Sequence, residues 1–366
     1  MFDKLHKQLA KRKRENSYRE LKLSDNLVDF CSNDYLGISR LLNFENKEPV
    51  GSTGSRLLQG NYSLIETLEQ ELASFHDANE ALVYNSGYVA NIGLFSCLPQ
   101  KDDVILYDEY IHASVKDGMR LSFAKSYSFK HNDLQDFEKK LLKLKKETKG
   151  NVYVTVESVY SMGGDKAPLR KITELTEYHS CVLVVDEAHA VGVYGKKGEG
   201  LVQYLGLENK VAIRVVTFGK AVGCHGAAVL CSNLIKTYLV NFSRSFIYST
   251  ALPPSTVAVI RKAYTQMKTS KQILLLQENI KYFKKAAEAG NLKSLMPSDS
   301  AVQCVLVPGN SEAKACSNLL RKNGFDVRAI LSPTVPVGMQ RVRICLHAFN
   351  RKQEIDGLFS VLSKFK

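Results

Sequence analysis

The chain has 366 residues, of which 45% are hydrophobic and 24% charged, a composition typical of a globular protein with one or two domains. It contains no apolar run long enough to span a bilayer, and its first residues are charged, so we expect a cytoplasmic protein without membrane contact. The net charge of +13 favours an anionic partner, which is a nucleic acid, a membrane surface or a phosphorylated small molecule or carrier. The eight cysteines form no CxxC pair, and we predict neither disulfides nor a metal site.

Apolar periodicity predicts helices and strands that alternate along the chain. The segment from residue 2 to about residue 22 is predicted to be an amphipathic helix, with Phe2, Leu5 and Leu9 on one face. Strands are predicted at 27–31, 81–84, 104–107, 124–129, 152–156, 181–185, 212–217, 227–231 and 246–248. Helices are predicted at 62–75, 89–97, 111–123, 133–146 and 169–178. This order predicts an α/β fold with a large, mostly parallel sheet covered on both faces.

The pair Pro253-Pro254 marks a break in this pattern. A long helical region is predicted after it, at 256–289. Smaller alternating elements follow at 302–307, 313–323, 341–346 and 353–366. We therefore predict an N-terminal segment at 1–45, a large domain at 46–252 and a small C-terminal α/β domain at 253–366.

A single lysine, Lys220, stands between two apolar runs, in a glycine-rich turn within Val215–Val229. Desolvation at the end of a buried strand lowers the pKa of an amine, and an uncharged amine attacks carbonyl groups. The residue type and its place therefore favour a Schiff-base lysine. The alternative is an ordinary surface lysine in a hairpin.

A second motif, Asp186-Glu187-Ala188-His189, follows the apolar strand 181–185. An acid at this place can face a cationic ring nitrogen or a magnesium ion, and His189 can reach the same pocket. The same four letters occur in helicases, but a helicase requires an upstream GxxxxGK[ST] phosphate loop, and the sequence contains none. A purely structural acid remains the alternative.

Two further features lie at strand ends. Asn85-Ser86-Gly87-Tyr88 precedes a predicted helix, where backbone N–H groups can bind phosphate, and His112 follows strand 104–107. An ordinary turn and a buried or capping histidine are the respective alternatives. A phosphate cradle, a flat histidine, an acid and a lysine at one sheet edge together suit pyridoxal 5'-phosphate.

The chain resembles the α-oxoamine synthases. These are pyridoxal-phosphate enzymes of fold type I, which is the aspartate aminotransferase-like class. The resemblance runs from about Phe30 to Leu346. It rests on motifs in one order: Ser32 to Gly37, Gly54 to Leu57, Asn85 to Tyr88, His112 to Ser114, Glu157 with Ser161 to Asp165, Asp186 to His189, Thr217 to Lys220, Tyr248 to Thr250, and Val335 to Gly338 with Arg341 to Arg343.

The resemblance implies a role for each matched residue. Lys220 would bind the cofactor aldehyde covalently and move the substrate proton, Asp186 would face the pyridine nitrogen, and His112 would stack on the ring. The remaining cofactor contacts would come from Gly87, Tyr88, Ser161, His189, Thr217 and, across a homodimer with shared active sites, Thr250. The amino-acid carboxylate would be bound by Asn33 and Arg343, with Arg19 as a further substrate contact.

The implied reaction is a decarboxylating condensation of an amino acid with an acyl thioester. The loop Gly54-Ser55-Arg56-Leu57 is similar to that of the members that join L-alanine to a pimeloyl thioester in biotin synthesis. A glycine-using member is the closest alternative, and a basic nucleic-acid-binding protein without catalysis is the alternative from another class. The acyl group would be carried by coenzyme A or by an acyl carrier protein. Cys224-His225, and Cys345 and His347 within the run 344–347, depart from the family pattern and leave the acyl-chain contacts undefined.

Overall fold

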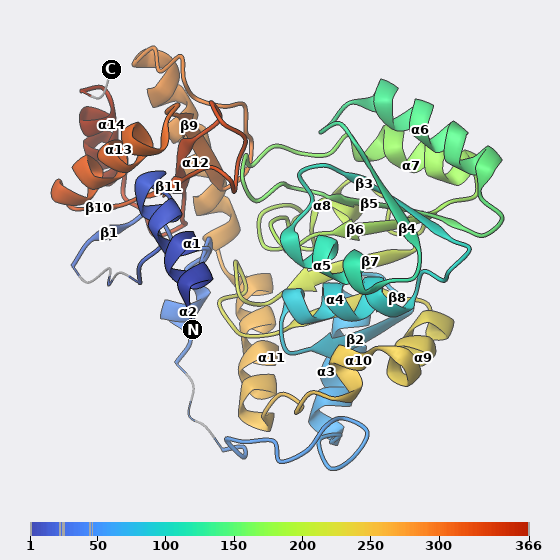
Figure 1. The fold of residues 1–366 in the computed structure, drawn as a ribbon. Helices are drawn as coiled ribbons and strands as arrows, with labels where there is room; N and C mark the ends of the chain where they lie inside the picture. The colour runs from blue at the N-terminus through green and yellow to red at the C-terminus, as the bar shows by residue number, and fades with distance from the viewer. Residues whose placement is uncertain (1, 22, 24–25, 44, 46, 365–366) are drawn as a thin grey trace. The chain divides into compact units, whose positions relative to one another are not determined.

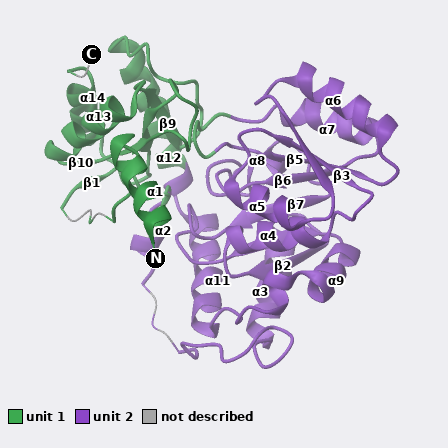
Figure 2. Ribbon diagram, in the orientation of Figure 1, with its two compact units in different colours: residues 1–35, 161–165, 274–366 green, residues 36–160, 166–273 purple. Residues whose placement is uncertain are grey.

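The computed structural model describes residues 2–21, 23, 26–43, 45 and 47–364. These residues form two compact units (Figure 2). Unit 1 contains residues 1–35, 161–165 and 274–366, and unit 2 contains residues 36–160 and 166–273. The three domains predicted at 1–45, 46–252 and 253–366 remain a prediction, because the units group residues by packing and not by position along the chain.

Unit 2 is built on a seven-stranded sheet with the order β2-β8-β7-β6-β5-β3-β4 (Figure 1). All neighbouring strands are parallel except at β8, which is antiparallel to both β2 and β7. The strands are β2 (Glu80–Tyr84), β3 (Val104–Asp108), β4 (Lys125–Phe129), β5 (Val152–Glu157), β6 (Val182–Asp186), β7 (Ile213–Thr217) and β8 (Ala227–Cys231). The predicted α/β fold with a mostly parallel sheet is confirmed.

Helices cover both faces of this sheet because successive strand residues point to opposite sides. On β6, Leu183 and Val185 join one buried cluster while Val184 joins the other. This confirms that the apolar run 181–185 is buried on both faces. The helices of unit 2 are α2 (Ile38–Leu41), α3 (Ser63–Phe75), α4 (Gly87–Cys97), α5 (Ala113–Leu121), α6 (Leu134–Glu147), α7 (Leu169–Tyr178), α8 (Leu201–Tyr204), α9 (Asn233–Phe242), α10 (Arg244–Ile247) and α11 (Pro254–Thr269).

Unit 1 contains a three-stranded antiparallel sheet with the order β11-β12-β9 and a short parallel pair, β1-β10. Helix α12 (Gln272–Ala289) begins in unit 2 and lies mostly in unit 1. The other elements are α1 (Asp3–Arg14), β1 (Val28–Asp29), β9 (Val302–Leu306), α13 (Asn310–Lys322), β10 (Phe325–Asp326), β11 (Arg328–Ile330), β12 (Arg341–Cys345) and α14 (Lys352–Leu362). Within the described residues, no helix has the length and apolarity that crossing a bilayer requires.

Several predicted elements differ from the structure in type or extent. The strand at 246–248 is wrong, because residues 244–247 form helix α10, in which the amides of Phe246 and Ile247 both donate to the carbonyl of Ser243. The helix at 2–22 ends at Arg14, where Asn16 has a left-handed φ of 51°, and residue 22 lies outside the described residues. The region 256–289 is interrupted between α11 and α12, and α14 stops at Leu362, before the undescribed residues 365–366.

Candidate active site

The carboxyl edge of the large sheet gathers the residues that the motifs singled out. Glu157 and Asp186 are register partners at the ends of β5 and β6, and Asp186 is in turn paired with Val215 on β7. Thr217 ends β7, three residues before Lys220. Ligands bind at this edge in open parallel sheets, so the strand order explains why residues far apart in the sequence converge.

Lys220 lies in the tight connection between β7 and β8. The amide of Gly223 donates to the Lys220 carbonyl at 2.8 Å, and the amide of Phe218 donates to the carbonyl of Gly226 at 2.9 Å. Gly223 and Gly226 have φ values of 68° and 116°, which side chains with a Cβ rarely adopt. The glycines therefore allow the turn that holds the half-buried lysine beside the sheet edge.

Asp186 is 7% exposed, and two donors hold its carboxylate. The Asn91 Nδ2 donates to Oδ2 at 2.9 Å, and the backbone amide of Ala188 donates to Oδ1 at 2.9 Å. Asn91 also donates to the hydroxyl of Ser114 at 3.0 Å. Sequence reasoning missed Asn91, which lies inside α4 without a motif of its own. The carboxylate is therefore oriented by a buried amide, as a partner for a cationic ring nitrogen requires.

His112 precedes α5, and its ring accepts a hydrogen bond from the backbone amide of Ser114 through Nδ1. The same nitrogen lies 2.7 Å from the Ser114 hydroxyl. Burial lowers the pKa of the imidazole, the Asp186 carboxylate opposes this effect, and the Lys220 amine adds to it. The structure thus brings His112, Asp186 and Lys220 within electrostatic reach of one another, with a neutral, flat imidazole among them.

The start of α4 has the features of a phosphate cradle. Ser86 caps this helix by accepting a hydrogen bond from the Val89 amide. A Cβ on Gly87 would lie 2.5 Å from the Thr217 Cγ2, so only glycine fits beside that strand end. The Thr217 Oγ1 is buried and has no hydrogen-bond partner among the described residues. An unsatisfied donor beside a helix N-terminus fits an anionic group such as phosphate.

Tyr88 and Thr250, two other predicted cofactor contacts, lie more peripherally. The predicted role of a third, His189, is not tested by the structure. The Tyr88 hydroxyl donates to Asp117 and its side chain is 44% exposed, so any phosphate contact would come from its backbone. Thr250 is exposed, and its carbonyl accepts a hydrogen bond from Asn85 at 2.8 Å. His189 is buried, at 5% exposure, three residues after Asp186.

Asn33 and Arg343, two of the three predicted substrate residues, contact each other within unit 1. The Arg343 Nη2 donates to the Asn33 Oδ1 at 2.9 Å, and its Nε donates to the Ser161 carbonyl at 2.9 Å. The Tyr35 hydroxyl donates to the same Asn33 oxygen at 3.1 Å. Arg19, on the segment after α1, donates to the Thr334 hydroxyl at 3.3 Å. The Arg343 guanidinium, oriented by the Asn33 side chain and the Ser161 carbonyl, suits the recognition of a carboxylate.

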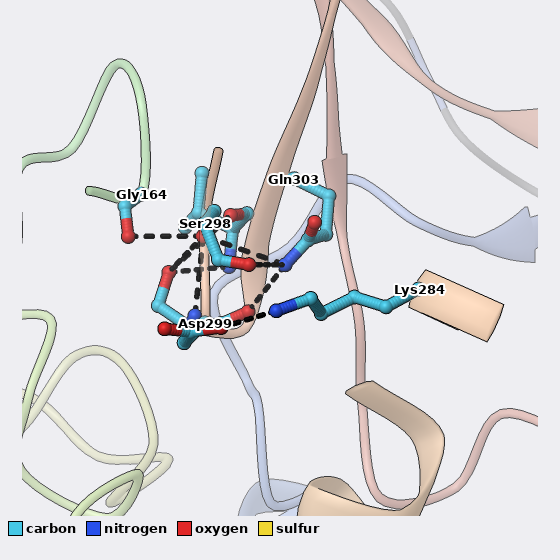
Figure 3. Close-up of polar contacts among 7 residues, drawn as sticks. Gly164, Lys284, Ser298, Asp299 and Gln303 are labelled. Carbon is cyan, nitrogen blue, oxygen red and sulfur yellow. Dashed lines mark hydrogen bonds and ion pairs between the residues drawn. The ribbon is translucent and has the colours of Figure 1, made fainter. Parts of the chain in front are cut away.

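Hydrogen bonds join the segment 161–165, which carries Ser161, to the small sheet of unit 1 and to the residues just before β9. The Ser298 hydroxyl donates to the Gly164 carbonyl at 2.9 Å (Figure 3). Gly164 has a φ of 76°, and a Cβ there would lie 2.0 Å from the Val302 carbonyl oxygen. The Arg341 Nη1 donates to the Met162 carbonyl at 2.9 Å. No motif in the sequence indicated Ser298.

His347, which departs from the family pattern, is fully buried in unit 1. Its Nε2 lies 3.1 Å from the Ser32 hydroxyl, which donates to Asp29 at 2.7 Å, and its Nδ1 lies 3.1 Å from the Asn350 Oδ1. Burial lowers the pKa of His347, and the Asp29 carboxylate opposes that effect. The histidine therefore supports the loop that carries Asn33.

Comparison with known proteins identifies the family. The profile of aminotransferase class I and II matches residues 25–362. The chain belongs to this family. An 8-amino-7-oxononanoate synthase of Emericella nidulans is 40% identical over 99% of this chain and 95% of its own length. A second one, from Lysinibacillus sphaericus, is 35% identical over 92% of this chain and 87% of its own.

Solved structures agree with this assignment. A serine palmitoyltransferase from S. paucimobilis with bound PLP is similar over 100% of this chain and 97% of its own, with a TM-score of 0.89 and 25% identity. An 8-amino-7-oxononanoate synthase from Francisella tularensis covers 93% of this chain and 98% of its own, with a TM-score of 0.79 and 29% identity. The predicted resemblance to α-oxoamine synthases and the predicted fold-type-I architecture are confirmed.

Proposed function

We propose that this chain is an 8-amino-7-oxononanoate synthase that condenses L-alanine with a pimeloyl thioester, releasing the thiol and carbon dioxide. The observation that carries the proposal is the convergence of Lys220, His112 and Asp186 at one sheet edge. The chain that carries these three residues aligns almost throughout with 8-amino-7-oxononanoate synthases, at 35–40% identity.

Pyridoxal 5'-phosphate supplies an aldehyde that reacts with amines and a ring that withdraws electrons from a neighbouring carbon. The residues present fit this group. The unsatisfied Thr217 Oγ1 and the start of α4 at Gly87 would bind the phosphate. Asp186, held by Asn91, would keep the ring nitrogen protonated, and the neutral His112 imidazole would stack on the ring.

The protein's own groups then perform the chemistry on alanine. The Lys220 amine removes the proton from the alanine Cα and later returns a proton to the same carbon. Arg343 and Asn33 bind the alanine carboxylate and fix the direction of the Cα–H bond. The alanine Cα, once it has lost its proton, attacks the carbonyl carbon of the thioester, and the thiol leaves. The resulting β-keto acid then loses carbon dioxide. We further propose a cytoplasmic homodimer in which Thr250 reaches the partner's cofactor.

The test is product identification with purified holoenzyme. Alanine, glycine and serine are each combined with pimeloyl-coenzyme A and, separately, with the short acyl thioester acetyl-coenzyme A, and the products are separated and identified by mass spectrometry. The proposal expects 8-amino-7-oxononanoate from alanine at a rate well above that of any product from the other amino acids. Preferential use of glycine with a short acyl thioester would identify the glycine-using alternative instead. A colourless protein without any condensation product would contradict both.

A further inference from the structure

Three side chains of unit 1 converge on one oxygen atom, the Oδ1 of Asn33. The Nη2 of Arg343 donates to this oxygen at 2.9 Å and the hydroxyl of Tyr35 at 3.1 Å, and the thiol of Cys345 is a weaker donor at 3.9 Å. Arg343 and Cys345 lie two residues apart on β12, so their side chains project to the same face of that strand. The cluster is therefore built from one strand and the short segment 33–35.

These contacts fix the direction of the Asn33 amide. A guanidinium can only donate hydrogen bonds, so the Asn33 atom that faces Arg343 is the oxygen and not the nitrogen. The Tyr35 hydroxyl gives its single proton to the same oxygen and accepts a longer bond from the Arg343 Nη2, at 3.5 Å. The Asn33 Nδ2 is thereby directed to the other side of the amide.

Both side chains keep donors that the fold does not use. The Arg343 Nε donates to the Ser161 carbonyl and its Nη2 to Asn33, but its Nη1 has no hydrogen-bond partner among the described residues. The same holds, within the described part of the chain, for the Asn33 Nδ2. Both residues are partly exposed. The Nη1 and the Nδ2 are therefore the donors that remain for the two oxygens of a carboxylate.

Tyr35 is the member of this cluster that is closed off from solvent, with 0% exposure. Its amide donates to the Asn33 carbonyl, and its carbonyl accepts from the Ala348 amide, each at 2.8 Å. Burial raises the pKa of Tyr35, so the hydroxyl keeps the proton that it donates. Because backbone bonds and packing hold the residue, phenylalanine at position 35 would keep the ring in place and remove the hydroxyl alone.

We propose that Tyr35 is a positioning residue for the amino-acid substrate. By donating to Asn33 and accepting from Arg343, its hydroxyl holds the amide and the guanidinium in directions in which both donate to one carboxylate. The inference rests on the proposed function, because it takes Asn33 and Arg343 as the residues that bind this carboxylate. Donors that are already oriented lose less conformational freedom when the substrate binds. Tyr35 therefore raises the affinity for the amino acid and leaves the affinity for the cofactor unchanged.

The direct test is a titration of the holoenzyme with L-alanine and with ethylamine, which lacks only the carboxyl group, followed by the visible absorbance of the cofactor. In Tyr35→Phe, the Kd of alanine is expected to rise about fivefold, the effect of one lost hydrogen bond. The Kd of ethylamine should stay within about twofold of the parent value, whereas a merely structural defect would weaken both ligands. An unchanged Kd for alanine, or an equal rise for both ligands, would overturn the proposal.

Two further variants serve as controls. Tyr264→Phe makes the same chemical change in unit 2, where the hydroxyl of the 4% exposed Tyr264 lies 3.1 Å from the His76 Nε2. It should lose as much thermal stability as Tyr35→Phe but bind alanine normally. In an Asn33→Ala background, Tyr35→Phe should weaken alanine binding by less than about twofold, because its route to the carboxylate is already lost. A full fivefold effect in that background would show that Tyr35 does not act through Asn33.

Steady-state kinetics separate this inference from the proposed function. In Tyr35→Phe, the KM for alanine should rise about fivefold, while the KM for pimeloyl-coenzyme A stays within about twofold. An unchanged KM for alanine, with normal formation of 8-amino-7-oxononanoate, would refute the role of Tyr35 and leave the synthase activity intact. Alanine binding that depends on Tyr35, without any condensation product, would refute the proposed function alone.

Discussion

The variant Asn91→Leu is expected to reduce kcat by roughly tenfold to a hundredfold. The side chain of Asn91 is 2% exposed, and its Nδ2 donates to the Asp186 Oδ2 at 2.9 Å and to the Ser114 hydroxyl at 3.0 Å. Leucine has a similar volume but no donor, so among the described residues the carboxylate keeps the Ala188 amide as its one hydrogen-bond donor. A hydrogen bond to a charged group contributes about 1.5–3 kcal/mol, which corresponds to a factor of about ten to a hundred in rate when it is lost at the transition state.

The assay combines steady-state kinetics with an absorbance titration of the cofactor and thermal unfolding of the apoprotein. Asn279→Leu is the matched control, because Asn279 is also buried and its Nδ2 donates to the carbonyls of His347 and Asn350 at 2.8 Å each. Both variants should lose stability, but only Asn91→Leu should weaken cofactor binding. If Asn91→Leu is destabilised like its control yet keeps kcat and cofactor affinity within about twofold, the positioning role of Asn91 is wrong.

Three further predictions test other groups of the site and core. Lys220→Arg keeps the charge but cannot bind the aldehyde, so the visible absorbance of the holoenzyme and the turnover should both disappear; normal turnover would disprove the assignment. Thr217→Val removes a buried hydroxyl that has no described partner, so the apoprotein should be as stable or up to about 1 kcal/mol more stable, while cofactor binding weakens about tenfold. Thr173→Val, which also removes a buried hydroxyl without a described partner, should leave cofactor binding unchanged. Burial raises the pKa of Glu187 from 4.5 to about 7, so the folded chain holds a proton that the unfolded chain releases. Stability should therefore fall by up to about 3 kcal/mol as pH rises from about 4.5 to 7, and Glu187→Gln should abolish that contribution in denaturant unfolding at several pH values.

The sheet of unit 2 could be predicted because its signal is local. Uninterrupted apolar runs such as 182–185, rich in β-branched valine, are long enough for a strand and too short for a helix of typical length. The run 246–248 carries the same apolar signal, yet most of it lies in a helical turn. The Ser243 carbonyl starts this turn by accepting hydrogen bonds from two backbone amides. The two short strands β10 and β11 were not predicted, because they exist only through pairing with β1 and β12.

The chemically reactive part of the site could be predicted for a similar reason. Asp186 ends a strand, Lys220 and His112 each follow one, and parallel strands bring their carboxyl ends to one edge. Asn91 and Ser298 could not be found in this way. Each is an ordinary polar residue in sequence, and each acquires its role through a contact with a residue far along the chain, Asp186 or Gly164.

Arg343 shows how the fold commits one side chain to several tasks. Its Nε donates to the Ser161 carbonyl and its Nη2 to the Asn33 Oδ1, so it joins the segment that carries Ser161 to the loop that carries Asn33. A lysine has three donors on one nitrogen and cannot hold two acceptors in these directions while also receiving a substrate carboxylate. The planar guanidinium can, because its donors diverge in fixed directions. Arginine at position 343 therefore suits the architecture of unit 1 as much as the charge of the proposed substrate.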